Sequence, residues 1–92
     1  MRVRWLLRAV EDVERILEYI ARDSPGAAVS ETEKIVAVVK RLGEVPASGR
    51  PGRVPDTREL VVSSYIVAYR VKGCLVQVLR VLHGARRWPE EL

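Results

Sequence analysis

Cysteine, histidine and aromatic residues are scarce in this 92-residue sequence, and each shortage excludes a class of site. The single cysteine, Cys74, cannot form an intramolecular disulfide. The single histidine, His83, leaves no cluster of histidine and cysteine ligands for zinc. Phe is absent, so Val, Leu and Ile must fill the core. The sequence also has no P-loop, dinucleotide fingerprint or serine-triad motif, and we expect neither a metal nor a cofactor.

Long apolar runs are missing as well. The short apolar stretch near the start is interrupted by Arg2, Arg4 and Arg8, which argues against a signal peptide. No stretch approaches the length of a membrane span, so we expect a cytoplasmic protein without membrane association. Hydrophobic residues make up 48% of the sequence and charged residues 30%, which is typical of a folded chain. The length predicts a single domain over 1–92.

Positive charge exceeds negative charge. Sixteen Lys and Arg residues against twelve Asp and Glu give a net charge of +4 and a pI of about 9.7. Most of the basic residues are Arg, whose planar fork matches phosphate and carboxylate groups. A basic surface suits nucleic acid and an acidic protein partner equally, so charge by itself leaves both open.

The first half of the sequence predicts one strand and two helices. Val3 and Trp5 alternate with arginines, as in a half-buried strand. The apolar stripe of the first helix consists of Val10, Val13, Ile16, Leu17 and Ile20. Its solvated face consists of Glu11, Asp12, Glu14 and Glu18. A second helix is expected between the start signal Ser24-Pro25 and the end signal Gly43, antiparallel to the first.

The second half predicts an irregular loop and three strands. Residues 44–57 are rich in proline and glycine, which favours a loop. A period of two then indicates antiparallel strands over 58–62, 65–71 and 74–82, joined by tight turns at 63–64 and 72–73. Counting from these turns places Tyr69 opposite both Arg58 and Val76, and Tyr65 opposite Arg80.

This register assigns the strand residues to two faces. The expected core face comprises Arg58, Leu60, Val62, Tyr65, Val67, Tyr69, Val71, Val76, Val78, Arg80 and Leu82. The expected open face comprises Glu59, Val61, Ile66, Ala68, Arg70, Leu75, Gln77, Leu79 and Val81. A slip of one residue would exchange the two sets.

These elements define an α+β fold class. A helical hairpin covers one face of a four-stranded, mainly antiparallel sheet, in the order strand, helix, helix, strand, strand, strand. The open face keeps several apolar side chains, and such a surface is typical of a partner-binding site. The residues expected to bind that partner are Val61, Ile66, Leu75, Leu79 and Val81.

Several motifs, in their order and spacing, resemble the RelE/ParE toxin superfamily, and its ParE branch most closely. The motifs are Tyr19-Ile20, SPGAA over 24–28, TRELVV over 57–62, YIVAYRV over 65–71 and LRVLHGARRWP over 79–89. The resemblance covers nearly the whole chain. It implies the toxin of a type II toxin–antitoxin system, of the kind linked to plasmid stabilization and bacterial growth inhibition. It also implies neutralisation by a cognate antitoxin in a hetero-oligomer.

The resemblance leaves two activities open. ParE-like toxins are taken to inhibit DNA gyrase, whereas RelE-like toxins are endoribonucleases that cleave mRNA on the ribosome. RelE-like sequences commonly have an arginine after the first tyrosine of the third strand, where this sequence has Ile66. They also often have a tyrosine after the last strand, where this sequence has Trp88-Pro89. These departures favour a non-catalytic gyrase inhibitor. A toxin relic that only binds its antitoxin is a third hypothesis.

The residues expected to contact the target come from the last two strands and from the segment after them. They are Arg70, Arg80, His83, Arg86, Arg87 and Trp88. In a ribonuclease His83 and Arg86 would be the catalytic pair, because the ordinary pKa of histidine suits acid–base chemistry at neutral pH. Structural roles are the alternatives: His83 could anchor the C-terminal segment, Trp88 could fold back and seal the edge of the core, and Arg70 could pair with Glu59.

The remaining arginines and Tyr19 are assigned structural roles. Arg58 and Arg80 are expected to stack on tyrosine and to pair with a carboxylate, a role favoured over target contact. Arg50 and Arg53 are expected to solvate their loop, with phosphate binding as the alternative. Tyr19 is expected to pack against the core.

Overall fold

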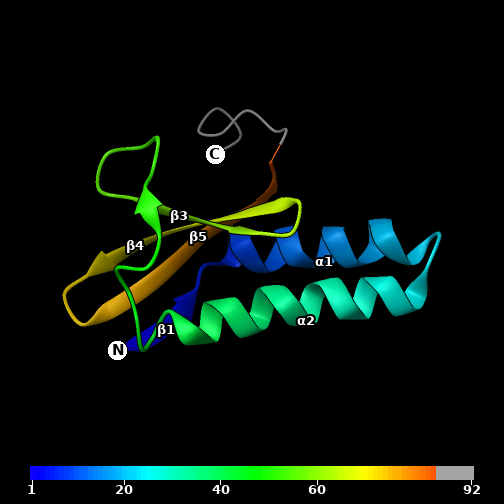
Figure 1. Cartoon of the computed structure of the whole chain (residues 1–92), viewed down its shortest axis with the longest axis horizontal. Coiled ribbons are helices and arrows are strands. Elements are labelled where there is room, and N and C mark those ends of the chain that lie inside the picture. Colours follow the sequence, from blue (N-terminus) through cyan, green and yellow to red (C-terminus); the bar gives the residue numbers. More distant parts are fainter. Residues whose placement is uncertain (85–92) are drawn as a thin grey trace.

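Two helices cover one side of a mixed β-sheet in the computed structural model, which describes residues 1–84 (Figure 1). The strands are β1 (Arg2–Trp5), β2 (Arg50–Pro51), β3 (Arg58–Val62), β4 (Tyr65–Lys72) and β5 (Leu75–His83). The helices are α1 (Leu7–Ala21) and α2 (Pro25–Arg41). This arrangement confirms the predicted α+β class and the helical hairpin.

The helical hairpin begins and ends close to the predicted signals. The Ser24 hydroxyl accepts a hydrogen bond from the Ala27 N–H at 3.2 Å, and Pro25 occupies the first turn of α2. Helices α1 and α2 lie side by side beneath the sheet in Figure 1. Within residues 1–84, neither helix has the length and apolar composition needed to cross a bilayer.

Helix α1 is rotated relative to the predicted stripe. Ala9 and Asp12 are its buried residues, whereas Val10 and Leu17 are each more than one third exposed. The expected placement of Asp12 on the solvated face was therefore wrong. The rotation has a physical reason: the Asp12 carboxylate is bonded to β5, and this contact turns the polar residue inward while small Ala9 allows close approach to the sheet.

The sheet has five strands in the order β1-β5-β4-β3-β2. Strand β1 runs parallel to β5, and all other neighbours are antiparallel. The additional strand β2 lies inside the segment predicted as a loop, which corrects that prediction. It is limited to Arg50 opposite Glu59 and Pro51 opposite Arg58, and an edge position tolerates a proline because its missing N–H would face away from the sheet.

The register of β3 and β4 is as predicted, with Arg58 opposite Tyr69. The turn between β4 and β5 is instead formed by Gly73-Cys74, where Gly73 has a φ of 61° that glycine adopts without strain. Tyr69 therefore lies opposite Val78. Tyr65 lies opposite His83 rather than Arg80, because the register shifts by one further residue between Ala68 and Tyr69.

A β-bulge corrects the predicted faces in the second half of β5. Tyr69 is opposite Val78 but Ala68 is opposite Arg80, so Leu79 has no counterpart on β4. After this extra residue, Val81 packs in the helix-facing core with Ala9 and Ile35. Leu82 lies instead with Ala68 on the other face. The two residues had been assigned the opposite way, because a sequence pattern of period two contains no signal for a bulge.

The core lies between the helices and β3–β5. Its largest cluster is Ala9, Ile35, Val39, Val62, Val67, Val78 and Val81. A second cluster joins Leu42 of the α2 C-terminal end to Tyr69 and Val76. On the opposite face, Val54 from the segment between β2 and β3 packs against Ala68 and Leu82. That face is therefore partly covered by the chain itself.

Candidate functional site

A groove of about 590 Å³ lies between α1 and the ends of β4 and β5. The helix contributes Asp12, Arg15, Ile16, Glu18, Tyr19 and Arg22, and the strands contribute Tyr65, Val81, Leu82 and His83. Arg15, Tyr19 and Arg22 are spaced by four and three residues, so successive turns of α1 direct them to one side. Tyr19 is 70% exposed, which shows that the expectation of core packing was wrong.

His83 and Tyr65 form an aromatic pair in this groove. They are opposite each other on β5 and β4, and their rings meet edge to face with centroids 5.7 Å apart. Burial raises the pKa of the Tyr65 phenol, and the Glu31 carboxylate and the Tyr19 phenol raise it further. Tyr65 is therefore protonated at neutral pH, where it can donate a hydrogen bond but cannot act as a general base.

The inner wall of the groove holds a buried ion pair. Asp12 accepts hydrogen bonds from Arg80 Nε at 2.7 Å and Arg80 Nη2 at 3.0 Å, one on each carboxylate oxygen. Its Oδ2 atom also accepts the Val81 N–H at 2.9 Å. Strand β1 ends opposite Val78, so on that side Val81 has no neighbouring strand to accept its N–H. The Asp12 carboxylate takes the place of the missing strand carbonyl. Arg80 thus has the carboxylate partner that the sequence predicted for it.

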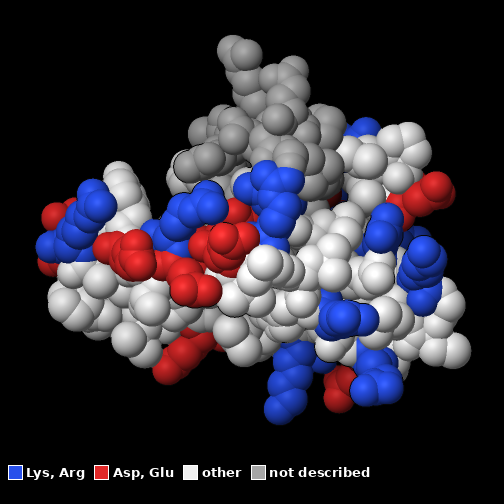
Figure 2. All heavy atoms as spheres, turned by 180° about the vertical axis from the view of Figure 1, so that it is seen from behind, with Lys and Arg blue, Asp and Glu red and all other residues white. Residues whose placement is uncertain are grey.

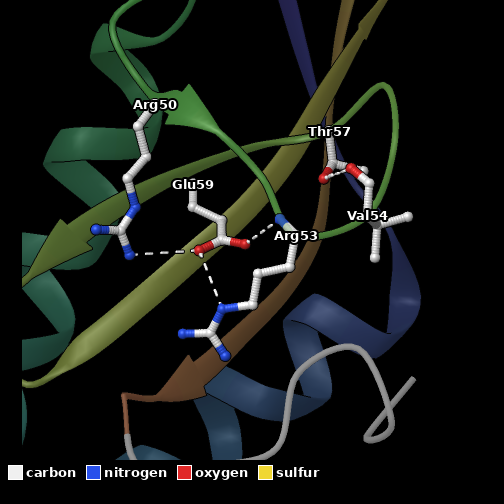
Figure 3. A network of polar contacts seen from close by, with 5 residues as sticks. All are labelled: Arg50, Arg53, Val54, Thr57 and Glu59. Atoms are coloured by element: carbon white, nitrogen blue, oxygen red, sulfur yellow. Dashed lines mark hydrogen bonds and ion pairs between the residues drawn. The ribbon is translucent and has the colours of Figure 1, made fainter.

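A second buried carboxylate organises the segment after β2 (Figure 3). Glu59 Oε2 accepts the Arg53 N–H at 2.9 Å, and Oε1 lies 3.4 Å from Arg50 Nη2 and 4.0 Å from Arg53 Nε. Arg50 and Arg53 are therefore held by an ion pair rather than merely solvating their loop. The expected alternative pairing of Glu59 with Arg70 is not formed. Arg70 Nε donates instead to Gln77 Oε1 at 2.6 Å.

Arg58 holds the segment that precedes β2. Its Nη1 donates to the Gly49 carbonyl oxygen at 2.7 Å and to that of Ala47 at 3.3 Å. The buried Tyr69 hydroxyl donates to the Pro46 carbonyl oxygen at 2.7 Å and accepts the Gly49 N–H at 2.8 Å. The expected carboxylate partner of Arg58 is replaced by backbone carbonyls, which the sequence pattern could not reveal.

The predicted target-contact residues are divided between distant places. His83 is exposed in the groove, Arg80 is 3% exposed, and Arg70 lies further along the sheet beside Gln77. Arg70 is five positions after Tyr65 on β4, a distance of roughly 17 Å along an extended strand. Arg86, Arg87 and Trp88 lie outside the described residues.

The predicted antitoxin-binding residues differ in exposure. Val61 is 59% exposed, Leu75 and Leu79 are half-buried, and Ile66 is buried. Val81 is buried on the helix side of the sheet and does not belong to the open face. The five residues therefore do not form one continuous exposed surface.

Sequence reasoning missed several residues of the groove. Arg15 and Arg22 had a detectable signal, because they share one helical side with Tyr19. Tyr65 had none, since its proximity to His83 depends on the bulge and on the true β4–β5 turn. The role of Asp12 could not be predicted either, because its partner Arg80 is 68 residues away in the sequence.

Comparisons with known proteins identify the class to which this fold and groove belong. The chain is 44% identical over 93 residues to the putative toxin Y4kP of Sinorhizobium fredii, covering 99% of this chain and 96% of that protein. It is 33% identical over 84 residues to Toxin RelE2 of Caulobacter vibrioides, covering 91% and 96%. These relatives define the class as toxins.

Solved structures agree with this class. The chromosomal ParDE toxin–antitoxin system from P. aeruginosa contains a chain with a TM-score of 0.80 and 31% identity, covering 90% of this chain and 95% of that one. The toxin–antitoxin complex RelBE2 from Mycobacterium tuberculosis gives a TM-score of 0.65 at 23% identity, covering 89% and 95%, which shows the shared fold. A profile of the ParE toxin of the type II toxin–antitoxin system parDE matches residues 3–88. The chain belongs to the ParE toxin family, and it is the toxin of a type II toxin–antitoxin system.

Proposed function

We propose that this toxin inhibits DNA gyrase by binding it, without catalysing a reaction itself. The observation that carries the proposal is the pairing of Arg80 with Asp12. RNA cleavage needs cations free to stabilise the charge that develops on the phosphate, and Arg80, three residues from His83, has its guanidinium committed to a buried carboxylate. Membership of the ParE family supports the same choice.

Two further features favour binding over catalysis. Ile66, next to Tyr65, is a buried apolar residue at the position where RelE-like sequences commonly have a cation. Tyr65 remains protonated because its pKa is raised, so it does not supply a base. His83 and Arg86 remain the residues that a ribonuclease would use. The likeness to Toxin RelE2 is the observation that favours this second function, cleavage of mRNA on the ribosome.

A cognate antitoxin is the second partner in this proposal, and its docking surface is the groove beside α1. The solved relatives are toxin–antitoxin systems. The groove offers an exposed tyrosine, Tyr19, of the kind that dominates binding energy at interfaces, flanked by Arg15 and Arg22, which suit an acidic segment. Of the residues first assigned to antitoxin binding, Val61 is the most exposed.

The gyrase proposal is tested by expressing the toxin without antitoxin and examining DNA and mRNA in the same cells. We expect double-strand breaks and filamentation, and purified gyrase should accumulate cleaved DNA when the toxin is added. Ribosome-dependent cleavage of mRNA with intact DNA would contradict the proposal and support the ribonuclease. The variant His83→Ala refines the test, since a ribonuclease would lose most of its activity. Tyr65→Phe is its control, because it keeps the ring beside His83 but removes the phenol.

The antitoxin proposal is tested with Tyr19→Ala and Val36→Ala, two substitutions of exposed helical residues, one inside the groove and one on α2 outside it. We expect Tyr19→Ala to weaken antitoxin binding by tenfold or more, on the order of a 2 kcal/mol contribution. Val36→Ala should change it little. Equal affinities for both variants would show that the antitoxin binds elsewhere.

A further inference from the structure

Four basic side chains lie together on the open face of the sheet, at the end that carries the β4–β5 turn. The register aligns Arg2 with Leu75 and Leu75 with Lys72, which forms one row across β1, β5 and β4. The next row aligns Arg4 with Gln77 and Gln77 with Arg70. We call the set Arg2, Arg4, Arg70 and Lys72 the four-cation face.

The alternation of side chains along the strands shows which face of the sheet carries these four residues. Val3, Val76 and Tyr69 pack into the helix-facing core, so their neighbours Arg2, Arg4, Leu75, Gln77, Arg70 and Lys72 are on the other side of the sheet. These rows precede the bulge at Leu79, which therefore does not disturb them. Arg2, Arg4 and Lys72 are exposed and Arg70 is half-buried.

The charges of this face have no carboxylate partner among residues 1–84. None of the ion pairs found within residues 1–84 involves any of the four cations. Arg70 is oriented by Gln77, a neutral acceptor that uses its Nε and leaves its charge intact. In Figure 2 the end of the molecule bearing β1 and the β4–β5 turn lies on the right, where basic side chains predominate, whereas both signs are interspersed on the left.

The four cations are close together, because they lie on three neighbouring strands of one sheet. Strands in a sheet are roughly 4.8 Å apart and alternate residues on one strand roughly 6.7 Å apart, so the four Cα atoms span about 10 by 7 Å. Four cations held this closely repel one another, and a bound polyanion removes that repulsion while releasing its own counterions.

The chemistry of the surface selects among polyanions. A protein partner would require an apolar centre, and Leu75, half-buried, is the apolar residue within the two rows. Single-stranded nucleic acid is bound largely by aromatic stacking, and the two rows contain no aromatic residue. Duplex DNA presents a regular array of phosphates that needs neither feature.

We propose that the four-cation face binds the phosphate backbone of double-stranded DNA through Arg2, Arg4, Arg70 and Lys72. The contact is independent of sequence, because the phosphate groups that it binds are the same at every base pair. It goes beyond gyrase inhibition, which a protein contact by itself could achieve. It would bring the toxin onto the same DNA on which gyrase acts.

The test is the salt dependence of binding to a short fluorescent DNA duplex, measured by anisotropy with the purified toxin. Four phosphate contacts predict a slope of log affinity against log salt of roughly −3.6. The variants Arg70→Gln/Lys72→Gln and Arg2→Gln/Arg4→Gln should each reduce the steepness by about 2 and weaken binding at low salt by tenfold or more. The matched control Lys34→Gln/Lys40→Gln removes the same net charge from α2 and should bind nearly as the unmodified toxin does.

Several outcomes would overturn the inference. A slope shallower than about −1 for the unmodified toxin excludes a four-phosphate contact, even if a variant fails to fold. Equal losses in the control pair would show that net charge alone governs binding. Tighter binding to duplex RNA, single-stranded DNA or polyglutamate would assign the face to another partner. If the toxin inhibits gyrase but does not bind DNA, this inference fails and the proposed function stands. If it binds DNA but does not inhibit gyrase, the inference stands and the proposed function fails.

Discussion

Two regions of this small protein contain arginines in contrasting surroundings. Around α1, β3 and the middle of β5, Arg80 is paired with buried Asp12, and Arg50 and Arg53 are paired with buried Glu59. Around β1 and the β4–β5 turn, the four-cation face has no carboxylate partner within the described residues. The same residue type therefore determines the packing of the protein in one region and the charge of its surface in the other.

This contrast shows that net charge is a poor guide to where a basic protein binds. Arginines that hold buried carboxylates contribute to the composition but add little positive potential, because their charge is cancelled within a few ångströms. The binding surface that we propose for DNA is built from cations without a carboxylate partner among residues 1–84. The following experiments should separate the two groups by their effects on stability.

Removing the carboxylate at Asp12 should have the largest effect. Asp12→Ala removes the carboxylate that pairs with the buried Arg80 guanidinium and should lower the free energy of unfolding by about 3–5 kcal/mol. Asp12→Asn should cost less, because its amide oxygen can still accept the Val81 N–H. Urea unfolding measures both, and a loss below about 1 kcal/mol for Asp12→Ala would show that Arg80 finds another partner.

Removing the Glu59 carboxylate should have an intermediate effect. Glu59→Ala breaks the hydrogen bond to the Arg53 N–H and both ion pairs, with an expected loss of about 1–3 kcal/mol. Glu59→Gln can keep the backbone hydrogen bond and should lose less. Limited proteolysis within residues 50–57 should be faster in Glu59→Gln than in the unmodified toxin, and faster still in Glu59→Ala. Unchanged cleavage in both variants would mean that Val54 and Thr57 hold the segment without Glu59.

Ionisation of Tyr65 should cause a smaller, pH-dependent change. Because its folded-state pKa is raised above 10.0, stability is fully present below that pH and is lost as the pH rises through the folded-state pKa. Tyr65→Phe should remove this part of the alkaline loss. Unfolding curves at neutral and alkaline pH provide the measurement, and identical alkaline losses in both proteins would contradict the assignment.

Neutralising the four-cation face should have the smallest effect on stability. Arg70→Gln/Lys72→Gln should change the free energy of unfolding by no more than about 0.5 kcal/mol, since neither residue has a charged partner to lose. At low salt the variant should be the more stable protein, because repulsion is relieved. A loss comparable to that of Asp12→Ala would mean that the two regions do not differ as described.

The predictable part of the structure depended on local patterns. Ser24-Pro25 located the start of α2, and the two-residue turn before Tyr65 gave the correct register of β3 and β4. The faces of β5 could be assigned only up to Leu79, where the bulge reversed Val81 and Leu82. The groove was found only in part, because His83 was expected but the helical residues Arg15, Tyr19 and Arg22 were not.

The sequence by itself determined the fold class and the helical hairpin, because periodicity, caps and turns act over a few residues. Its resemblance to the toxin family came separately, from the order and spacing of its motifs. Only the tertiary structure decided which arginines are neutralised. Asp12 meets Arg80 across 68 positions of the chain, and Arg4 reaches the row of Arg70 only through β5. Such placements depend on the order of the strands and on how α1 packs against β5, and no local pattern encodes either.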